Sequence, residues 1–146
     1  MFTKVEPKIG QIVKTGGERY DAYNASSTAL KAGDAVELAE VKFGRIGVQK
    51  LDSGECIGFV VSENIDREFA EGDEFTYASS HSFIALNAVG AIEVGDKVVP
   101  ATGGVEVATE PDEGPPVVVG NLDKVVGTAY SDAADGEIVI IKLSVN

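Results

Sequence analysis

The chain has 146 residues, of which 44% are hydrophobic and 17 are glycine. This composition excludes a largely disordered protein and is typical of one compact domain with many turns. The 24 acidic residues against 12 basic ones give a formal net charge of −12, which disfavours direct binding to nucleic acid, because such binding depends on Lys and Arg neutralising phosphates.

Residues 1–8 predict an extended N-terminal arm. Phe2 and Val5 lie among charged residues, and Pro7 would remove a ladder hydrogen bond from a central strand. Such an arm is either a frayed terminus or a tether that docks on a partner. Residues 9–146 are expected to form a single β-rich domain.

Short strands separated by polar turns are predicted over the first half of that domain. A first hairpin is expected from 9–14 and 19–23 around a glycine-bearing connection, followed by a loop over 24–31. Alternating apolar residues predict half-buried strands around Val36–Leu38 and Ile46–Val48. Residues 56–61 are apolar on both faces apart from Gly58, which predicts a central strand.

The second half continues this pattern after one predicted helical segment. Val61, Ile65 and Phe69 recur at helical spacing, so 62–70 is predicted to be a short amphipathic helix. Strands are expected at 75–77, 83–86, 91–94, 97–99 and 105–107, with a hairpin turn over 100–104. Residues 109–116 contain three prolines and three acids and predict an exposed, stiff loop. A closing hairpin is predicted from 125–130 and 138–143.

Four glycine–acid pairs each open a predicted strand: Gly33-Asp34, Gly72-Asp73, Gly95-Asp96 and Gly136-Glu137. Glycine takes a positive φ at little cost, and we expect the acid to bond nearby backbone before the strand begins. Residues 57–62 also resemble residues 126–131 in residue type. The acids at 34, 73, 96 and 137 are too unevenly spaced for a solenoid. The predicted class is all-β: a small, single-domain, barrel-like or sandwich fold of short antiparallel strands with at most one or two short helical turns.

Residues that could carry chemistry are sparse. Cys56 is the only cysteine, which excludes an intrachain disulfide, and its place beside Ile57 favours a small buried side chain. His81 is the only histidine and lacks partners for a zinc site or a nucleophile–base pair. Asp132, Asp135 and Glu137 do not follow the calcium-loop spacing and are better explained as a turn. We therefore expect no enzyme activity, no metal and no cofactor.

The order of these motifs resembles the capsid cement, or decoration, proteins of tailed bacteriophages. The resemblance covers roughly residues 20–143. It rests on the runs 30–36, 57–60, 71–73, 91–100, 103–104 and 126–129 continuing through Ile141. Each run is short and consists of common turn residues, so their order and spacing carry the resemblance.

The resemblance implies a β-rich structural virion protein, commonly a homotrimer, that binds the outer surface of the expanded capsid and resists internal pressure. Its implied partners are the major capsid protein and further copies of itself. Phe2, Thr3, Lys4 and Val5 in the arm are the predicted capsid contacts.

Two other readings remain open. One is a receptor- or glycan-binding β domain of a phage fibre or surface protein, which the absence of Trp disfavours. The other is a hydrolase that uses an acidic pair. The first residues lack a signal-peptide core, and no apolar run approaches the length of a membrane span. We therefore expect a soluble protein that is made in the host cytoplasm, has no membrane partner and becomes part of the virion.

Overall fold

A computed structural model describes residues 7–14 and 16–145. The strands are β1 (Ile12–Lys14), β2 (Arg19–Asn24), β3 (Leu30–Lys31), β4 (Ala35–Lys42), β5 (Arg45–Lys50), β6 (Cys56–Val61), β7 (Glu68–Phe69), β8 (Glu74–Ala78), β9 (Phe83–Asn87), β10 (Lys97–Ala101), β11 (Gly104–Val107), β12 (Gly127–Ala129) and β13 (Ile138–Leu143). One 3₁₀ turn, η1, covers Leu122–Lys124. The predicted all-β class, with at most one or two helical turns, is confirmed.

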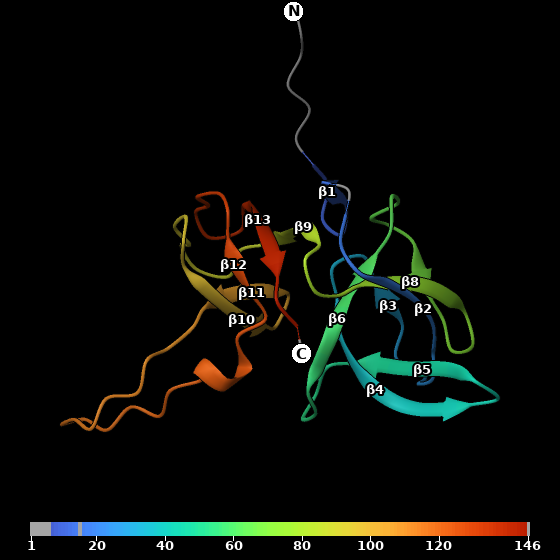
Figure 1. Ribbon diagram of the computed structural model, residues 1–146, viewed down its shortest axis with the longest axis horizontal. Coiled ribbons are helices and arrows are strands. Elements are labelled where there is room, and N and C mark those ends of the chain that lie inside the picture. The colour runs from blue at the N-terminus through green and yellow to red at the C-terminus, as the bar shows by residue number, and fades with distance from the viewer. Residues whose placement is uncertain (1–6, 15, 146) are drawn as a thin grey trace, which may run out of the picture.

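The strands form two units that lie side by side (Figure 1). The first is a closed barrel with the order β2-β5-β4-β6-β8, and the second is a sheet with the order β1-β9-β13-β12-β10-β11. A parallel bridge between Ala88 and Val105 brings the two ends of the second unit together, as the parallel pair β2·β5 does in the first. Apart from β1, the second unit therefore repeats the strand order of the first.

The echo between residues 57–62 and 126–131 has a structural counterpart, because β6 and β12 occupy corresponding places in the two units. Each carries a glycine that lies close to the neighbouring strand. A Cβ added to Gly58 would lie 2.3 Å from the carbonyl oxygen of Ala78, and one on Gly127 would lie 2.6 Å from that of Lys142. Only glycine permits this approach without a shift of the backbone.

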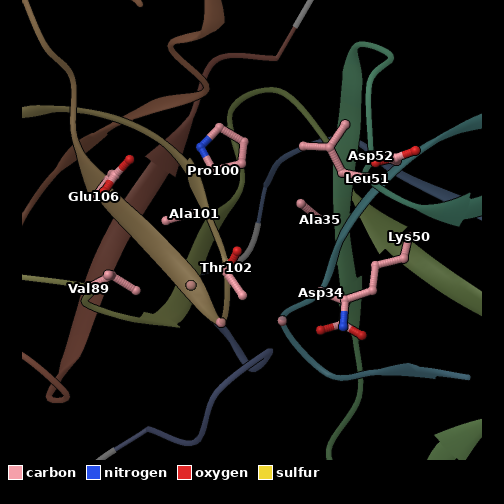
Figure 2. Close-up of a pocket in the computed structure, with 13 residues that line it drawn as sticks. Asp34, Ala35, Lys50, Leu51, Asp52, Val89, Pro100, Ala101, Thr102 and Glu106 are labelled. Carbon is pink, nitrogen blue, oxygen red and sulfur yellow. The ribbon is translucent and has the colours of Figure 1, made fainter.

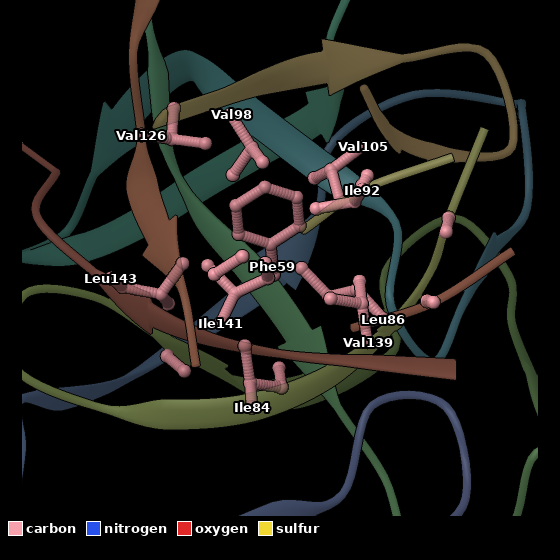
Figure 3. Close-up of a cluster of buried hydrophobic side chains, with 14 of the residues drawn as sticks. Phe59, Ile84, Leu86, Ile92, Val98, Val105, Val126, Val139, Ile141 and Leu143 are labelled. Atoms are coloured by element: carbon pink, nitrogen blue, oxygen red, sulfur yellow. The ribbon is translucent and has the colours of Figure 1, made fainter. Parts of the chain in front are cut away.

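Strand β6 separates two hydrophobic cores, because successive side chains of a strand point to opposite faces. Val60 is buried in the first core, inside the barrel, whereas Phe59 is buried in the second. Figure 3 shows the Phe59 ring surrounded by aliphatic side chains of the second unit. These include Leu86, Val98, Val105, Val126, Val139 and Ile141. The prediction of a central strand with two apolar faces is confirmed, since β6 pairs with both β4 and β8.

The predicted first hairpin is wrong, although both of its strands form. Strand β1 pairs with β9, whereas β2 pairs with β8 and β5. The connection between β1 and β2 is held to the segment that joins the two units: Glu18 N–H donates to the Ser80 carbonyl, and Ser79 N–H donates to the Glu18 carbonyl. These pairings with distant residues replace the local hairpin.

The helix predicted over 62–70 is also wrong. The Ser62 hydroxyl accepts the backbone N–H of Asn64 at 3.2 Å, and the Asn64 side chain accepts that of Asp66 at 3.0 Å. Such side-chain bonds favour turns over a helix. Phe69 then pairs with Leu30 in the small β3·β7 sheet, so the end of the predicted 24–31 loop is a two-residue strand.

The strand predicted at 91–94 is reduced to a single bridge between Ile92 and Ala133. The remaining strand and hairpin predictions are confirmed. Strands β10 and β11 pair as the expected hairpin, and β12 and β13 close the chain. Residues 109–116 are an exposed excursion, drawn in orange where it leaves the second unit in Figure 1.

Candidate functional site

The predicted capsid-contact residues, Phe2, Thr3, Lys4 and Val5, lie outside the described residues. The described chain begins at Pro7. Gly10 N–H donates to the carbonyl of Ala85 at 2.7 Å, which anchors this part of the chain to β9.

The residues considered for chemistry have structural roles. Asp132 accepts the N–H of Val94, Asp135 accepts that of Gly90, and Glu137 accepts that of Ala134. Only the bond of Glu137 lies within the predicted turn, whereas Asp132 and Asp135 accept from the distant segment 90–94. Within 7–14 and 16–145, no group of three or more His, Cys, Asp or Glu residues is placed to hold a metal ion. In the same part of the chain, no helix is long and apolar enough to cross a membrane.

A cleft of about 560 Å³ opens between the two units (Figure 2). The turn from Pro100 to Gly104 lies on one side, and Asp34, Ala35 and the segment 50–52 lie on the other. The carboxylate of Asp34 already accepts the N–H of Lys31 at 2.8 Å. The polar side chains that line the cleft are Lys50, Thr102 and the carboxylates of Asp34, Asp52 and Glu106.

A second hollow is lined by the loop 51–55, which hydrogen bonds to Glu37 keep in place. The carboxylate of Glu37 accepts the backbone N–H of Asp52, that of Gly54 at 3.3 Å and the side-chain amide of Gln49. These bonds, led by that from Asp52, lower the pKa of Glu37 despite its burial. Cys56 also lines this hollow, and burial raises the pKa of its thiol to about 11. The thiol is therefore a poor nucleophile.

The β4–β5 hairpin carries an exposed apolar face. Directly paired residues point to one side of a sheet, and Leu38 pairs with Val48 while Val41 pairs with Ile46. Val48 is buried in the barrel. Leu38, directly opposite Val48, is nevertheless 53% exposed, and Val41, nearer the tip of the hairpin, is 65% exposed. We call Leu38, Val41 and Phe43 the hairpin face.

Phe43 at the tip of this hairpin is 93% exposed and has a φ of 53°. Gly44 follows with a φ of 74°. Two positive φ angles define the turn that favours Asn-Gly, so an aromatic residue at the first position is unfavourable for the isolated chain. Exposure gives it no compensating packing. Backbone strain of this kind is found most often at binding and contact sites.

The second exposed apolar element is the segment 108–121, which we call the valine arm. Asn121 N–H donates to the carbonyl of Thr109 at its base, and Asp112 and Val118 exchange two backbone hydrogen bonds farther out. The arm is therefore an ordered, hairpin-like extension (Figure 1). Val117 is 73% exposed and Val119 is 87% exposed. Its charged residues are all acidic, Glu110, Asp112 and Glu113.

One aromatic patch lies on the second unit. The rings of Phe83 and Tyr130 meet edge to face with centroids 5.1 Å apart. The ammonium groups of Lys14 and Lys142 lie 5.2 Å and 5.8 Å from the centre of the Phe83 ring. An exposed ring beside hydrogen-bond donors can stack on a sugar or another flat ligand.

Comparison with known proteins supports the fold. No family model and no curated protein sequence matches the chain. The solved structure of the N base of head fiber gp8.5 from bacteriophage phi29 matches with a TM-score of 0.58 and 16% identity, covering 87% of this chain and 93% of that chain. The two proteins share a fold. Because the match covers most of both chains, it includes parts of both units.

Sequence reasoning identified the excursion at 109–116 but missed the hairpin face. The sequence contained one indication of it, because Phe43-Gly44 occupies the turn between two predicted strands, a position at which Asn-Gly is the usual pair. Leu38 was expected to be half-buried, but β4 extends past the barrel and has a register shift between Leu38 and Glu40. The alternation of apolar and polar residues does not show where a hairpin extends beyond the hydrophobic core.

Proposed function

We propose that the protein is a structural virion protein that binds, as an oligomer, the outer surface of the expanded capsid of a tailed phage and stabilises it against internal pressure. The observation that carries the proposal is the fold shared with a phage head fiber base over 87% of the chain. The resemblance of the sequence to capsid cement proteins points to the same location. In this proposal the protein is not an enzyme and needs no cofactor.

The exposed apolar elements support an adhesive role. The hairpin face and the valine arm present side chains that have no use inside the protomer, and singly they cover little area. Several copies joined together convert later contacts with a shell into intramolecular ones, so weak patches add to firm attachment. The proposed partners are the major capsid protein and two further copies of the chain in a homotrimer, without nucleic acid or membrane.

The proposed shell contacts include the N-terminal residues Phe2, Thr3, Lys4 and Val5. Removing residues 1–6 would test them, since this deletion leaves Lys8, whose carbonyl accepts the N–H of Gln11. We expect the shortened protein to keep its unfolding midpoint and to lose shell affinity. Unchanged affinity would exclude the arm as a contact.

Co-sedimentation with purified shells of the source phage tests the proposal itself. We expect saturable binding to expanded shells at a fixed ratio of copies to shell protein, and weaker binding to unexpanded shells. Absence of binding to both forms would refute the proposal.

A receptor- or glycan-binding domain of a phage fibre is the second candidate. The Phe83–Tyr130 patch favours it, because the exposed Tyr130 ring packs on the half-buried Phe83 ring beside two lysines, an arrangement suited to a sugar. The substitution Tyr130→Ala separates the two functions. It should abolish binding to host cells or glycans if the second candidate is correct, and leave shell binding intact if the first is correct.

A further inference from the structure

The hairpin face and the valine arm project from opposite ends of the molecule. In Figure 1 the arm extends from the second unit at the lower left, and the β4–β5 hairpin ends at the right. The arm of one protomer therefore cannot cover the hairpin face of the same protomer. An occupant of either apolar element therefore comes from outside the protomer.

The two elements are complementary in shape and charge. The hairpin face runs along β4 to the turn, and the arm is a narrow hairpin-like extension with Val117 and Val119 exposed. The four tip residues, 42–45, include Lys42 and also Arg45, whose guanidinium already pairs with the carboxylate of Glu74 in the same protomer. The valine arm has three acids and no base. Opposite charges around an apolar contact fix its orientation and discourage contact between like elements.

We propose that the valine arm of one copy docks on the hairpin face of a second copy, with Val117 and Val119 against Leu38, Val41 and Phe43. The acids of the arm then lie beside Lys42. This contact gives Phe43 the packing that compensates for its positive φ. Because the two surfaces differ, the contact is head to tail. A closed ring forms when the arm of each copy docks on the hairpin face of the next.

Ring closure also accounts for the size of the contact. Stable interfaces bury about 1,200–2,000 Å² in total, and a contact through one arm and one hairpin uses only a small part of each protomer. In a ring every copy takes part in two such contacts, so losing one does not release it. The inference deepens the proposed function by identifying the contact that builds the oligomer. Its test uses the protein alone, so its failure leaves the shell-binding proposal standing.

The first measurement is the molar mass of the protein in solution, by sedimentation velocity over a range of concentrations. The wild type should be an oligomer. Val117→Ser combined with Val119→Ser should weaken association by roughly ten- to a hundredfold, as truncation of central interface side chains does. Val41→Ser on the hairpin face should do the same. Val94→Ser is the matched control, because this valine is 61% exposed but belongs to neither element, and it should leave the mass unchanged.

Mixing the two association-deficient variants tests the head-to-tail geometry. The Val41→Ser protein keeps an intact arm, and the Val117→Ser/Val119→Ser protein keeps an intact hairpin face. One good contact remains possible between them, so the mixture should form a one-to-one heterodimer while each variant alone stays monomeric. Circular dichroism and the urea midpoint check that both variants are folded.

A wild-type protein that is monomeric at all concentrations would overturn the inference. So would an oligomer whose mass is unaffected by both sets of substitutions, since it would assemble through another surface. Failure of the mixed variants to form a heterodimer would exclude the docking of arm on hairpin face.

Discussion

Glu37 shows how a single acidic residue can stabilise this fold. Its side chain is buried, and its carboxylate accepts hydrogen bonds from the loop that follows β5. These bonds favour the charged form and lower the pKa of Glu37 below its usual value. A group whose pKa is lowered by folding stabilises the protein above its unfolded-state pKa, and this contribution is lost as the pH falls through the folded-state value.

Glu37→Gln should therefore destabilise the protein in a pH-dependent way. At pH 7 the variant should unfold at a lower urea concentration than the wild type, because a neutral amide is a weaker acceptor and turns an N–H₂ group toward the loop. The difference should shrink as the pH is lowered below 4 and the wild-type carboxyl becomes protonated. Urea titrations at several pH values measure this. A difference that does not vary with pH would contradict the assigned role.

Cys56 should be nearly inert toward thiol reagents in the folded protein. Burial raises its pKa to about 11, so at pH 8 only about one thiol in a thousand is ionised, and the thiol packs against the second core. Reaction with a chromogenic disulfide should be at least tenfold slower in buffer than in urea. Equal rates in both conditions would show that the segment around Cys56 opens freely.

The glycine–acid turns are the elements that the sequence predicted in most detail. In all four pairs the glycine has a positive φ. The side chains of Asp34, Asp73, Asp96 and Glu137 each accept the N–H of the residue three positions earlier, at 2.8 to 2.9 Å. The prediction succeeded because every atom of such a turn lies within a few residues of chain.

Asp96→Ala tests one of these turns. It removes the acceptor for Glu93 N–H and should cost about 1 kcal/mol of unfolding free energy, the usual contribution of one such hydrogen bond. Asp96→Asn keeps an acceptor oxygen and should cost clearly less. Urea denaturation of the three proteins provides the comparison. Equal losses in both variants would assign the effect to charge rather than to the hydrogen bond.

The elements that were mispredicted depend on distant partners. The first hairpin was expected from a turn sequence, but β1 and β2 belong to different units. The helix over 62–70 was expected from apolar spacing, but Phe69 is apolar because it pairs with Leu30 in a two-stranded sheet and packs in the first core. Local patterns do not reveal which distant strand a residue will meet.

At the scale of the whole molecule, the two units are coupled through Phe59. This residue belongs to the first barrel but is fully buried in the core of the second unit. The sequence suggested one domain with two similar segments, but it did not indicate that β6 contributes side chains to two hydrophobic cores. The candidate surfaces depend on the same arrangement, because the units place the hairpin face and the valine arm at opposite ends.

Phe59→Ala should destabilise both units together. Loss of a fully buried Phe costs about 3–5 kcal/mol, and we propose that the units unfold as one domain. Urea titrations followed by tyrosine fluorescence and by far-UV circular dichroism should give one shared, lowered midpoint. The tyrosine signal covers both units, because Tyr77 lies in the first barrel and Tyr130 in the second unit. Val94→Ala, at an exposed site outside the hairpin face and the valine arm, should change the free energy of unfolding by no more than about 0.5 kcal/mol. Separate transitions for the two units would contradict the coupling.

A cryo-electron microscopy map of expanded shells saturated with the protein tests most directly whether it is a component of the outer capsid surface. We predict ordered density outside the shell at symmetry-related sites, into which the two units fit as trimers. Expanded shells that carry no such density, under conditions where the protein is folded and in excess, would contradict the proposal.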